Sequence, residues 1–240
     1  MWYSVPSLDF RLCGTREWFC NFVEQCLKNR EMGNHGFMNS VITRFNIKMY
    51  FRGCRSEVDR WLGFATHPQL QELELTMHDV YTWSVHPREE KYCLPQFVLN
   101  ATSLTILNLD CVKLEACFSI NLPSLKSLSL TYVQVEDELL HNLVLGCPSL
   151  ENLLVQECTT PSNLRISSST LKFLERNGEW DQIHLEAENL ELFDCGVNVC
   201  NFDIASSKKL TNLSLTDVYF SSSDSFENLI SGFPLLEKLT

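Results

Sequence analysis

The chain has 240 residues, and because 45% of them are hydrophobic it can bury a large core. The formal net charge of −11 opposes nonspecific attraction to nucleic acid or to an anionic membrane surface. No apolar run reaches the length of a membrane span, so we expect neither nucleic acid nor a membrane as a partner. Residues 1–60 carry a net charge of +3 and residues 61–240 a net charge of −14. The acidic part either only aids solubility or selects a basic partner.

Eleven cysteines could indicate disulfides, but the sequence contains no CxxC motif. Residues 1–10 lack the basic start and apolar core of a signal peptide. We therefore expect reduced thiols and a cytoplasmic or nuclear location.

The first predicted element is an amphipathic helix over residues 17–28, in which apolar residues recur at helical spacing. Its apolar positions are Trp18, Phe19, Phe22, Val23, Cys26 and Leu27. We expect core packing rather than nucleic-acid stacking for its aromatic residues, Trp18, Phe19 and Phe22, and for Trp61 further along the chain.

Residues 41–51 alternate in polarity, which predicts a half-buried strand. One face carries Val41, Phe45, Ile47, Met49 and Phe51, and the other carries Arg44, Asn46, Lys48 and Tyr50. A short helix is predicted to follow, with Ser56 as its N-cap and Asp59 three residues on. The residues expected to face inward from this helix are Val58, Trp61, Leu62 and Ala65.

A short phrase of the form LxxLxL then recurs along the chain. The phrases begin at Leu70, Leu104, Leu125, Leu150, Leu171, Leu190, Leu210 and Leu236. Their starts are 34, 21, 25, 21, 19, 20 and 26 residues apart, and most of these intervals fit the period of about 20 to 29 residues of leucine-rich repeats. The longest interval is explained by a polar surface loop over residues 78–93. The pattern predicts an α/β leucine-rich-repeat solenoid, with a curved parallel β-sheet on the concave face and helices and irregular legs on the convex face.

We expect residues 1–40 to form an N-terminal helical capping segment and residues 41–240 to form the solenoid, with its last repeat cut short at Thr240. Residues 136–145 are predicted to form a convex helix that ends at Gly146, and residues 224–231 another. The units at Leu171 and Leu190 fit the pattern least well, because Arg176 falls at a core position and residues 159–169 are polar.

Alternation within each phrase places the fourth and sixth positions in the core and the third and fifth positions on the concave face. A solenoid of this kind usually works as a binding surface, so we expect protein recognition by the outward residues. The predicted partner-binding residues are Glu72, Glu74, Asn108, Ser127, Ser129, Asn152, Asp194, Asn212 and Ser214. Their small and acidic character suits a polar or basic protein segment, although the sequence does not name the target.

Catalytic signatures such as GxGxxG, GxxxxGK[ST], GxSxG and HExxH do not occur, so we expect no enzyme and no cofactor. The six histidines lie in predicted loops or on helix edges without a partner at ligand spacing. Cys195 with Cys200, and Cys111 with Cys117, each lack a second pair or a close histidine to complete a tetrahedral site, so no metal site is expected.

Several longer segments resemble the plant F-box/leucine-rich-repeat proteins of the FBD class. They are MWYSVPSLDF, FVEQCLKNR, RFNIKMYF, VDRWLGFATHPQLQELEL, LPQFVLNATSLTILNLDCVKLE and LGCPSLENLLVQEC, in the order in which they occur in that family. The resemblance covers nearly the whole chain. It implies that the repeats choose targets for a Skp, cullin and F-box ubiquitin ligase.

The sequence departs from that family in lacking the helical F-box that precedes these segments and docks on the Skp adaptor. Adaptor binding is therefore doubtful for this chain. The alternative is an F-box-less fragment, decoy or scaffold that recognises proteins without a role in a ligase.

Overall fold

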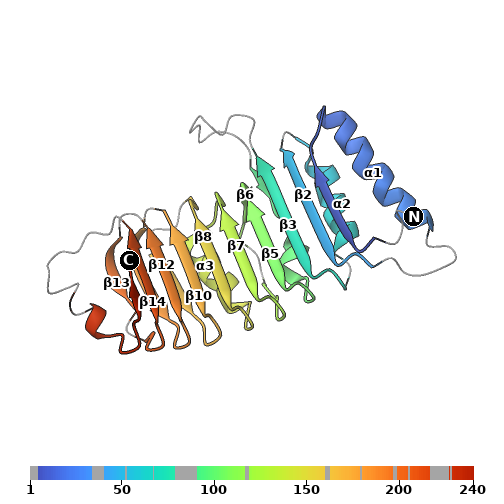
Figure 1. The fold of residues 1–240 in the computed structure, drawn as a ribbon. Helices are drawn as coiled ribbons and strands as arrows, with labels where there is room; N and C mark the ends of the chain where they lie inside the picture. Colours follow the sequence, from blue (N-terminus) through green and yellow to red (C-terminus); the bar gives the residue numbers. More distant parts are fainter. Residues whose placement is uncertain are drawn as a thin grey trace.

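A single parallel sheet runs the length of the molecule (Figure 1). The structure is a computed structural model that describes residues 5–33, 41–51, 53–66, 68–78, 91–116, 119–159, 163–178, 180–196, 199–204, 206–216, 227 and 229–240. Within these residues the sheet has ten strands, in the order β1-β2-β3-β5-β7-β8-β10-β12-β14-β15. The strands are β1 (Ser7–Arg11), β2 (Arg44–Tyr50), β3 (Glu72–His78), β5 (Ile106–Asp110), β7 (Ser127–Thr131), β8 (Asn152–Gln156), β10 (Phe173–Asn177), β12 (Leu192–Gly196), β14 (Asn212–Thr216) and β15 (Lys238–Leu239).

Each of the eight LxxLxL phrases forms one strand of this sheet, from β3 to β15, which confirms the leucine-rich-repeat solenoid. The fourth and sixth positions are buried as predicted in most repeats, for example Leu107 with Leu109 and Leu128 with Leu130. The exceptions lie in the last two strands, where Leu215 is only partly buried and Leu239 is 46% exposed. Leucines of successive repeats lie opposite one another in register, so they stack into continuous rows. One hydrophobic core therefore extends from Phe10 to Phe233.

The sheet begins earlier than the sequence indicated. β1 pairs in parallel with β2, with Ser7 opposite Arg44 and Arg11 opposite Lys48. The strand lacks the LxxLxL pattern, and its partner lies more than 30 residues away in the chain. The division at residue 40 stays a prediction, but a strand precedes the helix of the expected capping segment.

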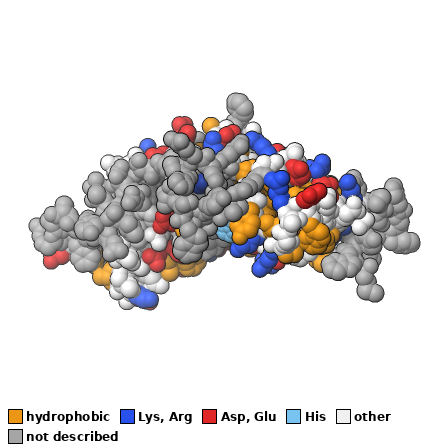
Figure 2. All heavy atoms as spheres, turned by 90° about the horizontal axis from the view of Figure 1, so that it is seen from above, with side chains coloured by type: hydrophobic (Ala, Val, Ile, Leu, Met, Phe, Trp, Pro, Cys, Tyr) orange, Lys and Arg blue, Asp and Glu red, His pale blue; other side chains and the backbone are white. Residues whose placement is uncertain are grey.

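Helix α1 (Arg16–Gly33) lies beside the edge strand β1 (Figure 1). Phe19 and Val23 are buried, whereas Trp18 and Phe22 are 52% and 42% exposed. The prediction that Trp18 and Phe22 pack in the core is wrong, because among the described residues α1 packs on β1 and α2 mainly with the face that carries Phe19 and Val23. Their rings stack on each other with centroids 5.4 Å apart. Seen from above, this end of the molecule shows apolar side chains among charged ones (Figure 2).

Helix α2 (Arg55–Ala65) packs behind the first strands and against α1. Trp61 is fully buried as predicted; its Nε1 donates to Glu24 Oε1 of α1 at 2.9 Å. Val58, Leu62 and Ala65 also face inward, as expected. The N-cap is Cys54 rather than the predicted Ser56, whose hydroxyl instead donates to Glu57 at 2.8 Å.

The convex face changes character along the solenoid. Its elements are β4 (Tyr92–Cys93), the 3₁₀ helix η2 (Gln96–Asn100), β6 (Val112–Lys113), α3 (Asp137–Leu145), β9 (Asn163–Ser167), β11 (Trp180–Glu186) and β13 (Val199–Asp203). β4 pairs with β6, and β9, β11 and β13 form a second parallel sheet in the order β13-β11-β9. The predicted helix ending at Gly146 is confirmed as α3. Of the other predicted helix, residues 224–231, the described residues 227 and 229–231 are helical, and the rest lie outside the described residues, as do residues 79–90 of the predicted loop.

The second sheet was not predicted, and repeat length explains it. The repeats that begin at Leu150, Leu171 and Leu190 are 21, 19 and 20 residues long, and they carry β9, β11 and β13. After the concave strand and two turns, too few residues remain for a helix of two or three turns, whereas an extended segment fits. The repeat that begins at Leu125 is 25 residues long and has room for α3.

Candidate functional surface on the open sheet face

One face of the ten-stranded sheet is turned toward the viewer in Figure 1 and is here called the open face. No helix of the described residues lies over it, since α2 and α3 lie behind the sheet. The third positions of the repeats form one row across it, and the fifth positions form a second, parallel row. The first row includes Glu72, Ile106, Ser127, Asn152, Phe173, Leu192 and Asn212. The second includes Glu74, Asn108, Ser129, Leu154, Glu175, Asp194 and Ser214.

All nine residues predicted to bind a partner lie in these two rows, and each is partly exposed. The structure spreads them over six strands, from β3 to β14, so no single pocket brings them together. Their position on the open face agrees with the predicted register. Their role in binding stays a prediction.

At the N-terminal end of the open face, charged side chains form ion pairs with one another. Arg44 Nε lies 3.0 Å from Glu72 Oε2 on the neighbouring strand, and Arg11 Nη2 lies 3.0 Å from Asp9 Oδ2. Exposed ion pairs of this kind contribute little to stability, but they satisfy the carboxylates locally. Glu72 is therefore less available to a basic partner than the sequence suggested.

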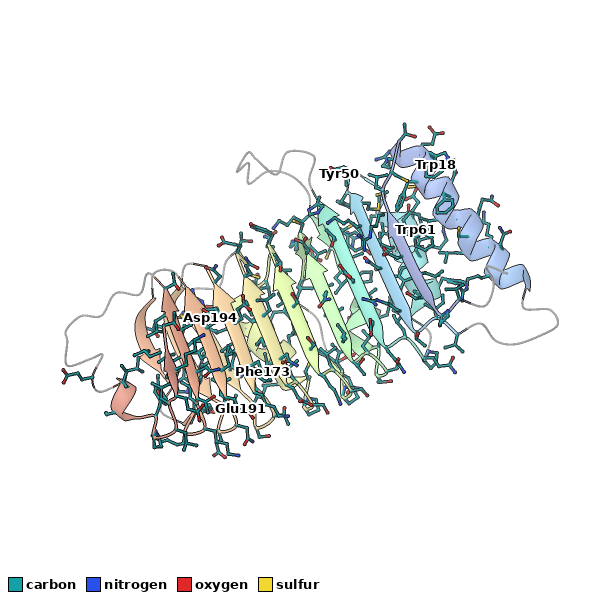
Figure 3. The ribbon with its side chains drawn as sticks, in the orientation of Figure 1. Trp18, Tyr50, Trp61, Phe173, Glu191 and Asp194 are labelled. Atoms are coloured by element: carbon teal, nitrogen blue, oxygen red, sulfur yellow. The ribbon has the colours of Figure 1, made fainter. Side chains whose placement is uncertain are left out.

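The C-terminal half of the open face carries a different surface, here called the Phe173 patch: Leu154, Phe173, Glu175, Leu192 and Asp194. Phe173 is 40% exposed and lies directly opposite Leu192 on β12. Glu175 lies opposite Leu154 on one side and Asp194 on the other. Figure 3 shows Phe173 and Asp194 on this part of the sheet. Aromatic residues, including phenylalanine, are enriched in protein–protein interfaces, so this exposed ring beside aliphatic side chains offers an apolar contact to a partner.

No ion pair of Glu175 or Asp194 with a described residue occurs within 4.0 Å. The two carboxylates stand side by side in register, so their charges repel each other. Such a pair attracts a cation or a basic side chain from outside. The Phe173 patch thus combines an apolar contact with unneutralised negative charge.

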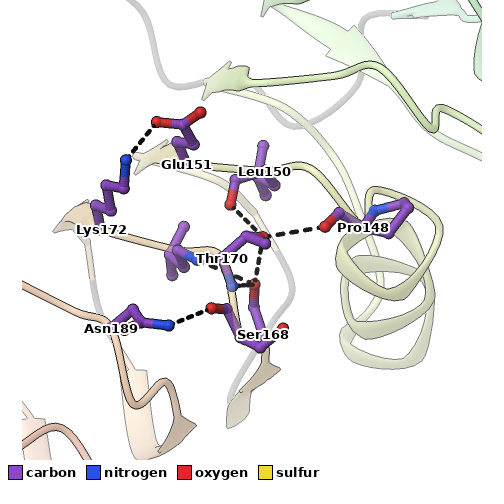
Figure 4. A network of polar contacts seen from close by, with 9 residues as sticks. Pro148, Leu150, Glu151, Ser168, Thr170, Lys172 and Asn189 are labelled. Carbon is purple, nitrogen blue, oxygen red and sulfur yellow. Dashed lines mark hydrogen bonds and ion pairs between the residues drawn. The ribbon is translucent and has the colours of Figure 1, made fainter.

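A network of polar contacts fixes the turn that leads into β10 (Figure 4). Thr170 Oγ1 donates toward Leu150 O at 2.8 Å and Pro148 O at 3.2 Å, which ties this turn to the preceding repeat. Ser168 Oγ accepts from the backbone N–H groups of Thr170 and Leu171. The turn is therefore held from two sides, and Phe173 is presented on a rigid strand rather than on a loop.

An ion pair lies next to the Phe173 patch, at the turn that leads into β10. Lys172 Nζ donates to Glu151 Oε2 at 2.9 Å, and this contact lowers the pKa of the Glu151 carboxyl (Figure 4). Glu191 lies near Lys172 and raises the pKa of its ammonium group further. Lys172 is thus engaged by acids at the border of the patch.

Sequence reasoning selected only polar residues at the outward positions, and so it missed Phe173, Leu154 and Leu192. The register rule that placed Asp194 correctly would also have placed these three, had apolar residues at outward positions been considered. Glu175 was missed because its repeat fits the pattern poorly, with Arg176 at a core position.

A polar groove of about 690 Å³ lies on the convex face between α3 and the second sheet. Its lining residues are Asp137, Glu138, His141, Asn163, Leu164, Arg165, Gln182 and His184. His184 Nδ1 lies 2.7 Å from Asp203 Oδ2, and His141 Nδ1 lies 3.0 Å from the carbonyl oxygen of Arg165. These contacts join neighbouring elements, and the lining residues include no serine, threonine or cysteine nucleophile.

One group of described residues has the composition of a metal site. The donor atoms of His78, Asp110 and Cys111 all lie within 4.8 Å of one another. The sequence did not indicate this group, because His78 and Cys111 are 33 residues apart and meet only through the pairing of β3 with β5.

The stacked parallel strands, the leucine rows and the open face define a leucine-rich-repeat protein. Residues 32–240 match the family described as "At1g61320/AtMIF1, LRR domain", and the chain belongs to this family.

Curated relatives carry related names. The chain is 29% identical over 199 residues to the F-box/FBD/LRR-repeat protein At1g13570 of Arabidopsis thaliana, an alignment that covers 82% of this chain and 42% of the relative. It is 32% identical over 187 residues to the F-box/LRR-repeat protein At3g03360 of the same plant, covering 69% of this chain and 36% of the relative. The chain thus spans less than half the length of these relatives. No solved structure matches it.

In the part of the chain that the structure describes, no helix combines the length and the apolar character needed to cross a membrane.

Proposed function

We propose that this chain is a protein-recognition module whose open face binds a segment of a partner protein, with the Phe173 patch at the centre of the interface. The single observation that carries the proposal is the exposed Phe173 ring in register beside Leu192 and next to the paired carboxylates of Glu175 and Asp194. Aromatic residues near the middle of an interface account for much of its binding energy.

The chemistry of the patch favours one kind of ligand. An apolar side chain of the partner would cover Phe173 and Leu192, and a lysine or arginine next to it would approach Glu175 and Asp194. The remaining predicted residues, such as Asn152 and Asn212, flank Phe173 and Leu192 in the same row and offer amide hydrogen bonds. The partner segment is therefore basic and carries an apolar anchor.

We further propose that this recognition selects substrates for a Skp, cullin and F-box ubiquitin ligase in the cytoplasm or nucleus. The F-box/LRR names of the relatives and the sequence resemblance support this role. The alternative is a scaffold or decoy that binds the same targets without a ligase. Co-expression with a plant Skp adaptor distinguishes the two, because recovery of the adaptor with the chain supports the ligase role and recovery of targets alone supports the scaffold.

Catalysis is the less favoured alternative. The convex groove gathers ionisable groups, but His184 is held by Asp203 and Glu186, and Asp137 accepts from the backbone N–H of Asn163. These side chains connect α3, β9, β11 and β13. We therefore assign the groove to the architecture and not to an active site.

The test compares two exposed phenylalanines. Phe173 and Phe97 are 40% and 42% exposed, but Phe97 lies on η2, away from the open face. Proteins captured from a plant-cell extract are quantified for the parent chain and for the variants Phe173→Ser and Phe97→Ser. Proteins that bind the open face will be depleted with Phe173→Ser and kept with Phe97→Ser.

The best captured protein is then purified and titrated with each variant. We expect Phe173→Ser and Asp194→Lys each to weaken binding about tenfold or more, which corresponds to about 1.4 kcal/mol. The matched charge reversal Glu188→Lys, at an exposed position outside the patch, should leave binding unchanged. Equal affinity for the parent chain, Phe173→Ser and Asp194→Lys would place recognition elsewhere.

A further inference from the structure

His78, Asp110 and Cys111 come together at the carboxyl ends of two neighbouring strands. In the β3–β5 pairing Thr76 lies opposite Asp110, so His78, two residues beyond Thr76, extends along the same face. The imidazole of His78, the carboxylate of Asp110 and the thiol of Cys111 offer donor atoms that all lie within 4.8 Å of one another. The cluster is independent of the Phe173 patch and of the proposed function.

The backbone at Cys111 explains how two consecutive residues can both contribute. Cys111 has a φ of 59°, in the left-handed region that is unfavourable for a non-glycine residue. Its N–H donates to the carbonyl oxygen of Thr131 at 3.0 Å, which fixes the bend. Tyr132 and Glu157 take the same conformation at the equivalent points of the next two repeats. Three successive repeats therefore share this bend. Of the three, only the repeat of Cys111 has a thiol at the bend with a histidine beside it.

Asp110 provides a second and independent observation. Its Oδ1 atom is buried and has no hydrogen-bond partner among the described residues. A buried acceptor without a partner destabilises the folded state, and more so when it carries charge. A cation bound between Asp110, His78 and Cys111 would remove this penalty.

The donor set decides which cation fits. Thiolate and imidazole ligands favour zinc and related transition metals over magnesium or calcium, which prefer oxygen. Zinc takes sulfur at about 2.3 Å and nitrogen or oxygen at about 2.0–2.2 Å, so tetrahedral donors lie about 3.4–3.7 Å apart. The three donor atoms already lie within 4.8 Å of one another, so a bound ion would draw them together by no more than about 1.4 Å. Three protein ligands leave a fourth position for water or for a group from a partner.

We propose that His78, Asp110 and Cys111 bind one divalent transition metal ion of the zinc class. The ion links the ends of β3 and β5, and binding releases the thiol proton of Cys111. This site supplies the nearby histidine that the sequence around Cys111 lacks.

The test uses the full chain without an affinity tag, freed of metal and titrated with Co²⁺ as a spectroscopic probe and with Zn²⁺ as a competitor. We expect one Co²⁺ per chain, a thiolate-to-cobalt charge-transfer band in the near ultraviolet, and loss of that band when Zn²⁺ is added. Excess Zn²⁺ should also raise the melting temperature, because a ligand that binds only the folded state stabilises it.

Three variants remove one ligand each: His78→Ala, Asp110→Asn and Cys111→Ser. The loss of a metal's outer-shell partner costs about 10- to 100-fold in affinity, so the loss of a direct ligand should cost at least as much. Cys111→Ser should abolish the charge-transfer band. Circular dichroism without metal verifies that each variant folds, and any one folded variant suffices for the test.

Two matched controls keep the result specific. Cys158→Ser removes another partly buried thiol, and His141→Ala removes a histidine of the convex groove. Both should bind Co²⁺ like the parent chain. The proposal is wrong if the parent chain shows no saturable charge-transfer band, or if the band persists with unchanged affinity in Cys111→Ser or disappears in Cys158→Ser.

Discussion

Arg176 and Cys195 lie opposite each other in register on β10 and β12, with the Nη1 of Arg176 3.3 Å from the Sγ of Cys195. The arginine is 1% exposed and also donates to the carbonyl oxygens of Gly196 and Gly178. Burial lowers the pKa of the guanidinium and raises that of the Cys195 thiol. A charged side chain thus occupies a position that leucine, valine or cysteine fills in other repeats, and its two Nη groups donate to backbone carbonyl groups just after β10 and at the end of β12.

The first prediction concerns this buried arginine. Arg176→Met keeps most of the volume but leaves the carbonyl groups of Gly178 and Gly196 without their donor. We expect a loss of about 1–3 kcal/mol in the free energy of unfolding, measured by urea denaturation. Arg165→Met, at an exposed position of β9, should change stability by less than about 0.5 kcal/mol. A more stable Arg176→Met variant would show that the charge costs more than its hydrogen bonds return.

Much of the fold could be predicted from the sequence, although residues such as Arg176 break the repeat pattern. The spacing of leucines predicted eight strands and their faces, because each repeat contains its own signal. The features that were missed depend on neighbours distant in the chain. β1 becomes a strand by pairing with residues more than 30 positions away, and Trp18 is exposed because, among the described residues, α1 packs mainly with its other face.

The candidate surface also combines features that a local sequence signal predicts with features that depend on distant parts of the chain. The outward positions of Asp194 and Asn152 could be predicted from alternation alone. The pairing of acids into a repelling couple, and the meeting of His78 with Cys111, both require the register between strands. Local composition carries no information about that register.

The second prediction concerns Gly146, the C-cap of α3. A Cβ atom at this position would lie 2.6 Å from Ile120 Cγ2 and 2.8 Å from the Ile120 carbonyl oxygen. Since the backbone cannot move aside as a side chain can, Gly146→Ala should destabilise the chain by about 1–3 kcal/mol. The comparison is Gly63→Ala, inside α2, where a Cβ atom meets nothing within 4 Å.

Gly63→Ala should increase stability by about 0.5–1 kcal/mol, because alanine loses less backbone entropy in a helix than glycine. Thermal melts of both variants against the parent chain provide the measurement. The same glycine-to-alanine change should therefore raise the melting temperature at position 63 and lower it at position 146. If Gly146→Ala melted at or above the parent temperature, the close approach of Ile120 would not be a real constraint.

The third prediction concerns Tyr92, which is fully buried and donates from its hydroxyl to Asp59 Oδ1 at 2.5 Å. Burial and the neighbouring carboxylate raise its pKa well above the ordinary value of 10.0. Because the folded pKa exceeds the unfolded one, the stability that this group contributes is complete below pH 10 and is lost as the pH rises above it. Tyr92 should therefore ionise only when the chain unfolds.

Absorbance at 295 nm during an alkaline titration follows tyrosine ionisation, and circular dichroism follows unfolding. Tyr92 should ionise together with the loss of ellipticity, and Tyr92→Phe should remove that part of the absorbance step. Ionisation of Tyr92 in the folded chain would contradict the buried contact with Asp59.

The last prediction asks whether the Phe173 patch is maintained at the expense of stability. Glu175 and Asp194 face each other in register as like charges, an arrangement that destabilises a sheet. Asp194→Asn keeps the shape and removes the repulsion, so it should stabilise the chain by a few tenths of a kcal/mol at low salt. The gain should vanish near 1 M salt, where the screening length falls to about 3 Å. Glu188→Gln, at an exposed acid outside the patch, should give no such gain.

A stabilising Asp194→Asn that also weakens partner binding would show that the acid pair serves recognition and not folding, since functional sites commonly trade stability for activity. No change in stability, with binding intact, would mean that the two carboxylates neither repel each other nor serve the interface.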